Sequence, residues 1–116
     1  MAKYRTIKFY KSYFKDFYIT QSNDVRKKIN YVFYIVESQP IIPIKFFKSI
    51  EETDGLYEIR VEFNSNIYRI FCCMDSESLV ILFNGFQKKT QKTPFNEVKR
   101  AIKIMNEYIK EKGAHQ

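Results

Sequence analysis

The sequence predicts an α+β fold, in which a small antiparallel sheet of one N-terminal strand and three later strands carries two N-terminal helices and one C-terminal helix. Three observations support this prediction. Residues 4–10 alternate as a strand does, apolar residues recur at helical spacing in three stretches, and three strand-like runs follow one another closely between residues 56 and 83. A chain of 116 residues has room for one domain, so we expect a single domain over residues 1–116.

The later strands are expected at residues 56–63, 67–74 and 79–83. In the first of these runs, apolar side chains alternate with Glu58 and Arg60, which is typical of a strand with one buried face. The run at 79–83 is almost wholly apolar, so we expect it to be central and covered on both faces. The short connections between the runs favour antiparallel hairpins.

The helices are indicated by capping residues and by apolar periodicity. Residues 12–20 bring three aromatic rings to one side, and a second helix is expected to begin near Ser22 and to end near residue 37. The last helix is expected to begin with Thr93 as its N-cap and Pro94 in its first turn.

The net charge of the chain indicates which classes of partner it could bind, but does not choose one of them. Twenty Lys and Arg residues against 13 Asp and Glu residues leave a net charge of +7. Such a charge favours nucleic acid, an anionic membrane surface or an acidic protein, and a solvated surface that serves only solubility explains it equally well. Adjacent Cys72 and Cys73 should face opposite sides of a strand, which argues against a disulfide and for a reducing compartment. No apolar run approaches the roughly 20 residues of a membrane span, so we expect a cytoplasmic protein without membrane contact.

Several catalytic chemistries are excluded by residue type. The one histidine, His115, stands beside the C-terminus, so a zinc site and a Ser-His-Asp or Cys-His arrangement are not expected. The sequence has no glycine-rich phosphate loop. We therefore expect no metal and no cofactor.

Cations concentrate around the last three expected strands. Antiparallel pairing brings Arg60, Arg69 and the basic segment after Phe86 to one edge of the sheet, where guanidinium and ammonium groups suit phosphate oxygens. Arg60 shares a strand face with Glu58 and Glu62, and a cross-strand ion pair is its alternative reading, while a solvated loop is the alternative reading of the lysines. Aromatic rings nearby could stack unpaired bases or belong to the core, and the residue with the strongest claim to a wet position is Tyr68, because of its hydroxyl. These residues alone indicate a basic nucleic-acid-binding domain.

Three motifs in this order resemble the RelE/HigB-type toxins of type II toxin–antitoxin systems, and in particular their phage-derived Gp49-like branch. They are Leu-Tyr-Glu-Ile-Arg at 56–60, Ile-Tyr-Arg-Ile-Phe at 67–71, and Gly-Phe-Gln-Lys-Lys-Thr-Gln-Lys-Thr-Pro at 85–94. The resemblance extends more loosely to the first strand, to residues 47–50 and to the last helix.

This resemblance implies a RelE-like fold and a small ribonuclease without a cofactor, which enters the ribosomal A site, cuts the mRNA there and so inhibits translation. It also implies a cognate helix-turn-helix antitoxin. The catalytic residues that it implies are Arg60, Arg69, Lys88 and Lys89, and the expected RNA-binding residues are Tyr68, Phe86, Thr90 and Lys92. Many relatives use a histidine or a C-terminal tyrosine for proton transfer, whereas this chain has no histidine before His115.

A mechanism follows from residue chemistry. Arginine keeps its charge at physiological pH and can stabilise a phosphorane, while a lysine among other cations has a lowered pKa and can exchange protons nearer neutrality. Glu58 is the nearby carboxylate that could act as a base, with a structural ion pair as the alternative. Two other functions stay open: a non-catalytic nucleic-acid-binding or phage-type host-inhibitor protein, and a degenerate toxin that binds its antitoxin but no longer cuts.

Overall fold

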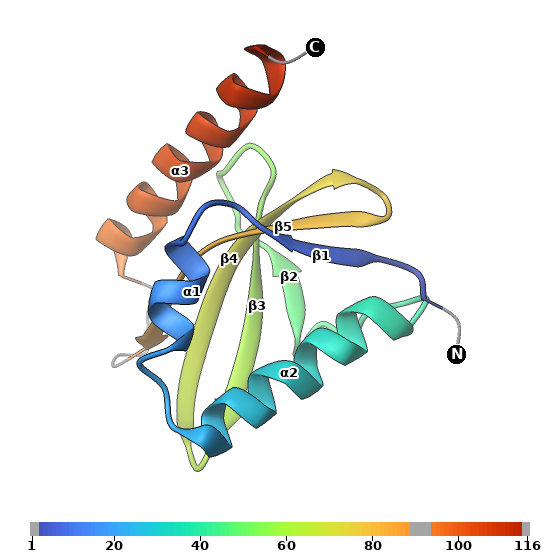
Figure 1. The fold of residues 1–116 in the computed structure, drawn as a ribbon, viewed down its shortest axis with the longest axis vertical. Helices are drawn as coiled ribbons and strands as arrows, with labels where there is room; N and C mark the ends of the chain where they lie inside the picture. The colour runs from blue at the N-terminus through green and yellow to red at the C-terminus, as the bar shows by residue number, and fades with distance from the viewer. Residues whose placement is uncertain (1–2, 89–93, 115–116) are drawn as a thin grey trace.

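A five-stranded mixed sheet with three helices forms the fold in the computed structural model, which describes residues 3–88 and 94–114 (Figure 1). The strand order across the sheet is β1-β5-β4-β3-β2. The elements in chain order are β1 (Thr6–Phe9), α1 (Tyr13–Tyr18), α2 (Asn23–Ser38), β2 (Phe47–Ser49), β3 (Leu56–Phe63), β4 (Asn66–Ser76), β5 (Leu79–Lys88) and α3 (Phe95–Ala114).

The α+β class, the two N-terminal helices and the C-terminal helix are confirmed, but the sheet is not purely antiparallel. β1 pairs in parallel with β5, with Thr6 opposite Leu79 and Phe9 opposite Leu82. Alternation of side chains reveals a strand but not its direction, and β1 leads into helices rather than into a hairpin turn, so nothing local forces antiparallel pairing. β2 was not predicted as a strand because three residues are too few to show a period of two.

Helices cover both faces of the sheet. On one face, α1 and α2 bury a cluster that includes Phe14, Ile29 and Ile70, and on the other face α3 buries a cluster that includes Phe71 and Met105. Figure 1 shows α2 crossing the sheet on one side, with α3 standing apart from it. β5 is an interior strand that contacts both α1 and α3, which confirms the expectation for the run at residues 79–83.

Local signals set the boundaries of α2. The Ser22 hydroxyl accepts a hydrogen bond from the Val25 amide at 3.2 Å, as expected for the N-cap, and the helix ends at Ser38. Arg5 fixes the start of β1 to the end of α2 by hydrogen bonds to backbone oxygens there.

The adjacent thiols of Cys72 and Cys73 are free and belong to different core clusters. Cys72 lies beneath α1 and α2 and Cys73 lies beneath α3, which confirms that they face opposite sides of the sheet, as expected.

β5 is longer than predicted and irregular. It continues to Lys88, and its register against β4 shifts between Ile70 and Cys72, so that β5 holds one more residue than β4 across this stretch. Gly85 lies at this irregularity facing α1, where an added Cβ would stand 2.6 Å from the Phe17 ring. The absence of a side chain at residue 85 therefore allows α1 to pack directly on β5.

Candidate functional site

Three neighbouring strands bring basic side chains to the sheet face on which α3 packs. Arg60 on β3 lies opposite Arg69 on β4, and Arg69 lies opposite Phe86 on β5. One row further along, Lys88 lies opposite Ile67. This register brings Arg60, Arg69 and Lys88 onto neighbouring rows, as expected, but the three strands are the interior strands of the sheet and not its edge.

A fourth cation comes from the strand that was not predicted. Lys48 on β2 lies opposite Glu58 on β3, one row away from Arg60 and Arg69. We call Lys48, Arg60, Arg69 and Lys88 the basic cluster. Lys48 was missed because its strand was missed, although the alternation of Phe47, Lys48 and Ser49 was a weak signal for it.

Like charges directly opposite on paired strands repel each other, so the Arg60–Arg69 pair needs compensation. At Arg69 the compensation is a buried ion pair with Glu58. Arg69 is only 6% exposed to solvent, and Glu58 is only 4% exposed. The Arg69 Nη1 donates to the Glu58 carboxylate, while the buried Arg69 Nε has no hydrogen-bond partner within residues 3–88 and 94–114. Arg69 is thus a fixed cation whose charge is largely balanced by Glu58.

Arg60 is compensated differently and stays open to ligands. Its Nη2 lies 3.3 Å from a Glu62 carboxylate oxygen, and the side chains of Arg60 and Glu62 are 32% and 55% exposed. Among the described residues, Arg60 therefore forms an ion pair within its own strand, and not the cross-strand pair that was its alternative reading. Such an exposed pair is weak, so its arginine can exchange partners readily.

Lys88 lies where its positive charge is disfavoured. Burial lowers the pKa of the Lys88 amine, and the positive charge of Arg69 lowers it further, with smaller effects from Arg60 and Lys48 and an opposing effect from Glu58. This direction agrees with the expectation for a lysine among cations. A lysine with a lowered pKa can give up its proton nearer neutrality than a free lysine does.

The two aromatic residues that were expected at the RNA differ in position. Phe86 is partly buried on the face of the basic cluster, where it stacks on Phe71 with ring centroids 5.5 Å apart. Tyr68 is 5% exposed and belongs to the core cluster of the opposite face, beneath α1 and α2. The expectation of a wet Tyr68 is therefore wrong, because the parity of β4 directs residues 68 and 69 to opposite faces.

The remaining expected site residues, Lys89, Thr90 and Lys92, lie outside the described residues, as does His115. A buried polar residue that was not predicted stands near them in the sequence. Asn84 is 1% exposed, and its Nδ2 lies 3.5 Å from the Glu97 carboxylate in the first turn of α3. It links the irregular stretch of β5 to the helix that packs on the same face.

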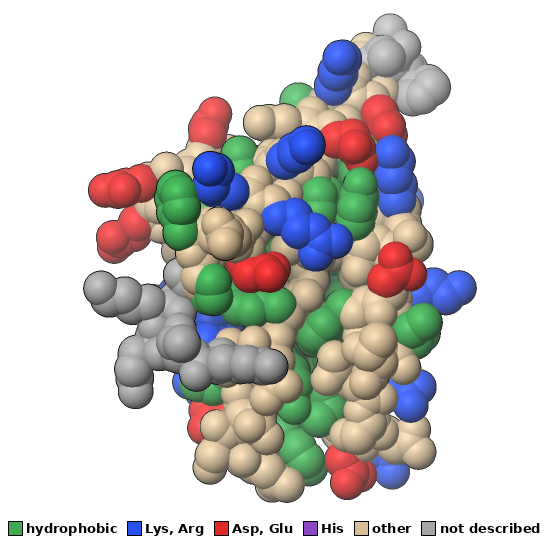
Figure 2. All heavy atoms as spheres, turned by 90° about the vertical axis from the view of Figure 1, so that its left-hand side faces the viewer, with side chains coloured by type: hydrophobic (Ala, Val, Ile, Leu, Met, Phe, Trp, Pro, Cys, Tyr) green, Lys and Arg blue, Asp and Glu red, His purple; other side chains and the backbone are tan. Residues whose placement is uncertain are grey.

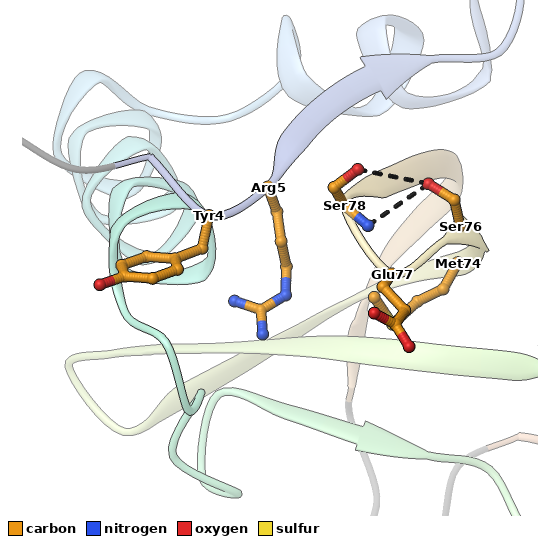
Figure 3. A pocket seen from close by; sticks show the side chains of 6 residues that line it. All are labelled: Tyr4, Arg5, Met74, Ser76, Glu77 and Ser78. Atoms are coloured by element: carbon orange, nitrogen blue, oxygen red, sulfur yellow. Dashed lines mark hydrogen bonds between the residues drawn. The ribbon is translucent and has the colours of Figure 1, made fainter.

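A hollow lies between the residues that begin β1 and the turn between β4 and β5, and the arginine that projects into it has a structural role. Arg5 projects into it but donates to the backbone oxygens of Val36 at 3.1 Å, Gln39 at 2.8 Å and Pro40 at 2.9 Å, and so closes the end of α2. Figure 3 shows Arg5 and Glu77 on opposite walls, with no polar groups converging on one point. This hollow of about 670 Å³ is lined by Tyr4, Arg5, Met74, Ser76, Glu77 and Ser78.

The face of the molecule that Figure 2 shows does not mark a site by charge alone. Figure 2 shows Lys and Arg side chains interspersed with Asp and Glu side chains over one side of the molecule, rather than gathered into one patch. Within residues 3–88 and 94–114, no group of three His, Cys, Asp or Glu side chains is placed to hold a metal ion. No helix of this described part is long and apolar enough to cross a membrane.

Comparison with known proteins adds one finding. Residues 16–106 match the model of the family described as Phage derived protein Gp49-like (DUF891). The matched stretch runs from α1 into α3 and includes the whole basic cluster. No curated protein matches the chain.

Proposed function

This chain belongs to the Phage derived protein Gp49-like family, and on that premise we propose that it is the toxin of a type II toxin–antitoxin pair, a RelE/HigB-type ribonuclease. In this proposal it cuts mRNA in the ribosomal A site, in the cytoplasm and without a metal ion. The observation that supports it most is the meeting of Arg60, Arg69 and Lys88 on adjacent rows of one sheet face.

The proposed reaction is attack of an RNA 2'-hydroxyl on the neighbouring phosphorus, which breaks the bond to the 5'-oxygen and leaves a 2',3'-cyclic phosphate and a 5'-hydroxyl. Arg60, exposed and weakly paired, is the group suited to the charge of the phosphorane. The Lys88 ammonium, with its lowered pKa, donates a proton to the leaving 5'-oxygen. Arg69 serves as a fixed positive charge beneath both.

Removal of the 2'-hydroxyl proton falls to Glu58, the carboxylate that the cluster holds against Arg69. A buried, paired carboxylate is a weak base, and a slow intrinsic reaction fits an enzyme that relies on the ribosome to position its substrate. Positioning alone can supply ~7–11 kcal/mol of the barrier. The scheme therefore predicts cutting of translated messages and little cutting of naked RNA.

One observation favours the second candidate function, a non-catalytic nucleic-acid-binding protein. Both arginines are ion-paired with carboxylates of β3, Arg60 with Glu62 and Arg69 with Glu58, which lowers the free positive charge that a phosphate would meet. In a protein that only binds RNA, charge suffices, so Arg60→Lys would keep function. In the ribonuclease, Arg60→Lys loses the planar two-point contact and much of the activity.

Induced expression of the wild-type chain, of two variants of the basic cluster and of one control variant tests the proposal. The wild type should arrest growth, and Lys88→Ala and Arg60→Ala should relieve the arrest at equal protein levels, whereas Lys103→Ala, an exposed change on α3, should not. Primer extension on a translated and an untranslated copy of one message locates the cuts. A soluble wild type without toxicity, or equal cutting of both copies, contradicts the proposal.

The proposed partner is a co-encoded helix-turn-helix antitoxin of opposite charge where it meets the toxin. Complementary charge speeds capture and cancels the field that attracts RNA. The antitoxin either covers the basic cluster or binds α1 and α2 and blocks entry to the A site. Titration calorimetry with a Lys88→Glu, Lys89→Glu variant distinguishes these modes, because affinity falls in the first mode and stays within about 1 kcal/mol of wild type in the second.

A further inference from the structure

A recess of about 640 Å³ opens beside the basic cluster, between β2, the start of β3 and the residues before β2. Its volume falls within the range of about 300–1,000 Å³ that is usual for small-ligand sites in proteins. Two residues of its lining, Lys48 and Glu58, also belong to the rows of the basic cluster. The recess is lined by Ile44, Lys48, Ser49, Ile50, Glu51 and Glu58.

Apolar side chains provide part of its wall. Ile44 is 78% exposed, and Ile50 is partly buried against the core cluster under α3. Apolar side chains at the wall of a recess of this size suit a flat aromatic ring, because the ring can bury its faces against them and present its polar edge to the charged groups of the recess. A nucleobase has this shape.

Two charged side chains of the recess, Lys48 and Glu51, differ from those of the rest of the site in having no ion pair among the described residues. Among residues 3–88 and 94–114, neither Lys48 nor Glu51 takes part in an ion pair, whereas Glu58, Arg60 and Arg69 all do. Lys48 is also close enough to Lys88 to lower the pKa of that amine. A phosphate at Lys48 would therefore lie next to the groups to which the cleavage is assigned.

The loop that carries Glu51 is held in place by its own hydrogen bonds. The Thr53 hydroxyl donates to the Ile50 carbonyl oxygen at 2.6 Å, and the Ile50 amide donates to the Leu56 carbonyl oxygen at 2.9 Å. The same loop contains Glu52 at a φ of 62°. A loop ordered in advance loses less entropy when a ligand binds, which favours a binding role for its side chains.

We propose that this recess binds one nucleobase of the RNA strand whose phosphates lie along the basic cluster, and that Glu51 selects the base. The inference rests on the proposed function for its ligand. A carboxylate only accepts hydrogen bonds, so it favours a base edge rich in N–H donors. Guanine presents two adjacent donors on its Watson–Crick edge, adenine and cytosine present one amino group each, and uracil presents one N–H between two carbonyl oxygens. The expected preference is guanine first and uracil last.

Binding of short RNAs tests the recess without requiring cleavage. The probes are 2'-O-methyl pentamers of uridine that differ only in a central G, A, C or U, and fluorescence anisotropy measures their dissociation constants with the whole chain. Wild type should bind the central-G pentamer about 5-fold to 150-fold more tightly than the all-U pentamer, the range of one good two-point base contact. Glu51→Gln should reduce this ratio to near one, because the amide side chain no longer favours a base edge rich in N–H donors.

The matched control is Glu52→Gln, which removes the same charge from the neighbouring exposed residue outside the recess lining. It should keep the wild-type ratio. Equal or unmeasurable binding of all four pentamers by wild type overturns the inference, and so does a G preference that survives Glu51→Gln. Mapping of cuts on translated mRNA tests the ribonuclease separately. Base-selective binding without any cutting would refute the proposed ribonuclease activity and would support the proposed base-binding recess.

Discussion

Removing one partner of the buried Glu58–Arg69 pair should destabilise the protein strongly, whereas replacing both partners should not. Both residues are nearly inaccessible to water, at 4% and 6% exposure. Glu58→Leu leaves the Arg69 guanidinium buried without a counter-charge, and Arg69→Met leaves the carboxylate in the same state. Loss of one partner of such a pair costs about 3–5 kcal/mol, while its replacement by apolar residues of similar volume is often neutral or stabilising.

The melting temperature measures the loss of stability in each variant directly. For 116 residues, an unfolding entropy of about 2.1 cal/mol/K per residue corresponds to about 4 °C per kcal/mol, so each single variant should melt about 12–20 °C below wild type. The double variant Glu58→Leu, Arg69→Met should melt above both single variants. Calorimetry at neutral pH, with urea unfolding as a second measure, provides the values.

The exposed pair of the same site is the matched control. Glu62→Gln removes the partner of Arg60, and because Glu62 is exposed and Arg60 is partly exposed the loss should stay below about 1 kcal/mol. A Glu58→Leu loss as small as that of Glu62→Gln would refute the reasoning, as would a double variant as unstable as the sum of the two singles. The result also bears on activity tests, since a loss of toxicity in Arg69→Ala would combine instability with the missing cation.

Three further outcomes are expected. If Lys88 donates the proton, the cleavage rate should fall as pH rises through the lowered pKa of Lys88, at a lower pH than for a free lysine. Lys88→Arg should abolish this fall in rate at alkaline pH. An unchanged fall in pre-steady-state assays of the variant would exclude Lys88 as the acid. Gly85→Ala should cost about 1–3 kcal/mol in urea unfolding, because the new methyl group meets the Phe17 ring at 2.6 Å, and a neutral result would show that α1 yields. Ser22→Ala should cost about 1 kcal/mol by removing the acceptor for the Val25 amide, whereas Ser22→Asp should keep most of the stability.

Local chemistry in the sequence determined the elements and part of the site. Capping by Ser22 and the apolar period placed α2 within a residue or two, and the alternation of residues 56–63 gave β3 its exact bounds. Antiparallel pairing of β3 and β4 follows from the short turn between them, and this pairing places Arg60 opposite Arg69. Each of these features depends on neighbours within a few residues, which is why the sequence reveals them.

Only the tertiary structure decided which side chains complete the site. Counting by twos from Phe83 places Gly85 and Gln87 on the face of α3, but the extra residue in β5 reverses this parity and puts Phe86 and Lys88 beside Arg69. The parallel direction of β1 and the addition of Lys48 through the short strand β2 depend equally on partners distant in the chain. The burial of Tyr68 and the pairing of Arg69 with Glu58 follow from which face the helices cover, because burial and counter-charges are set by packing between elements and not by the order of residues within one.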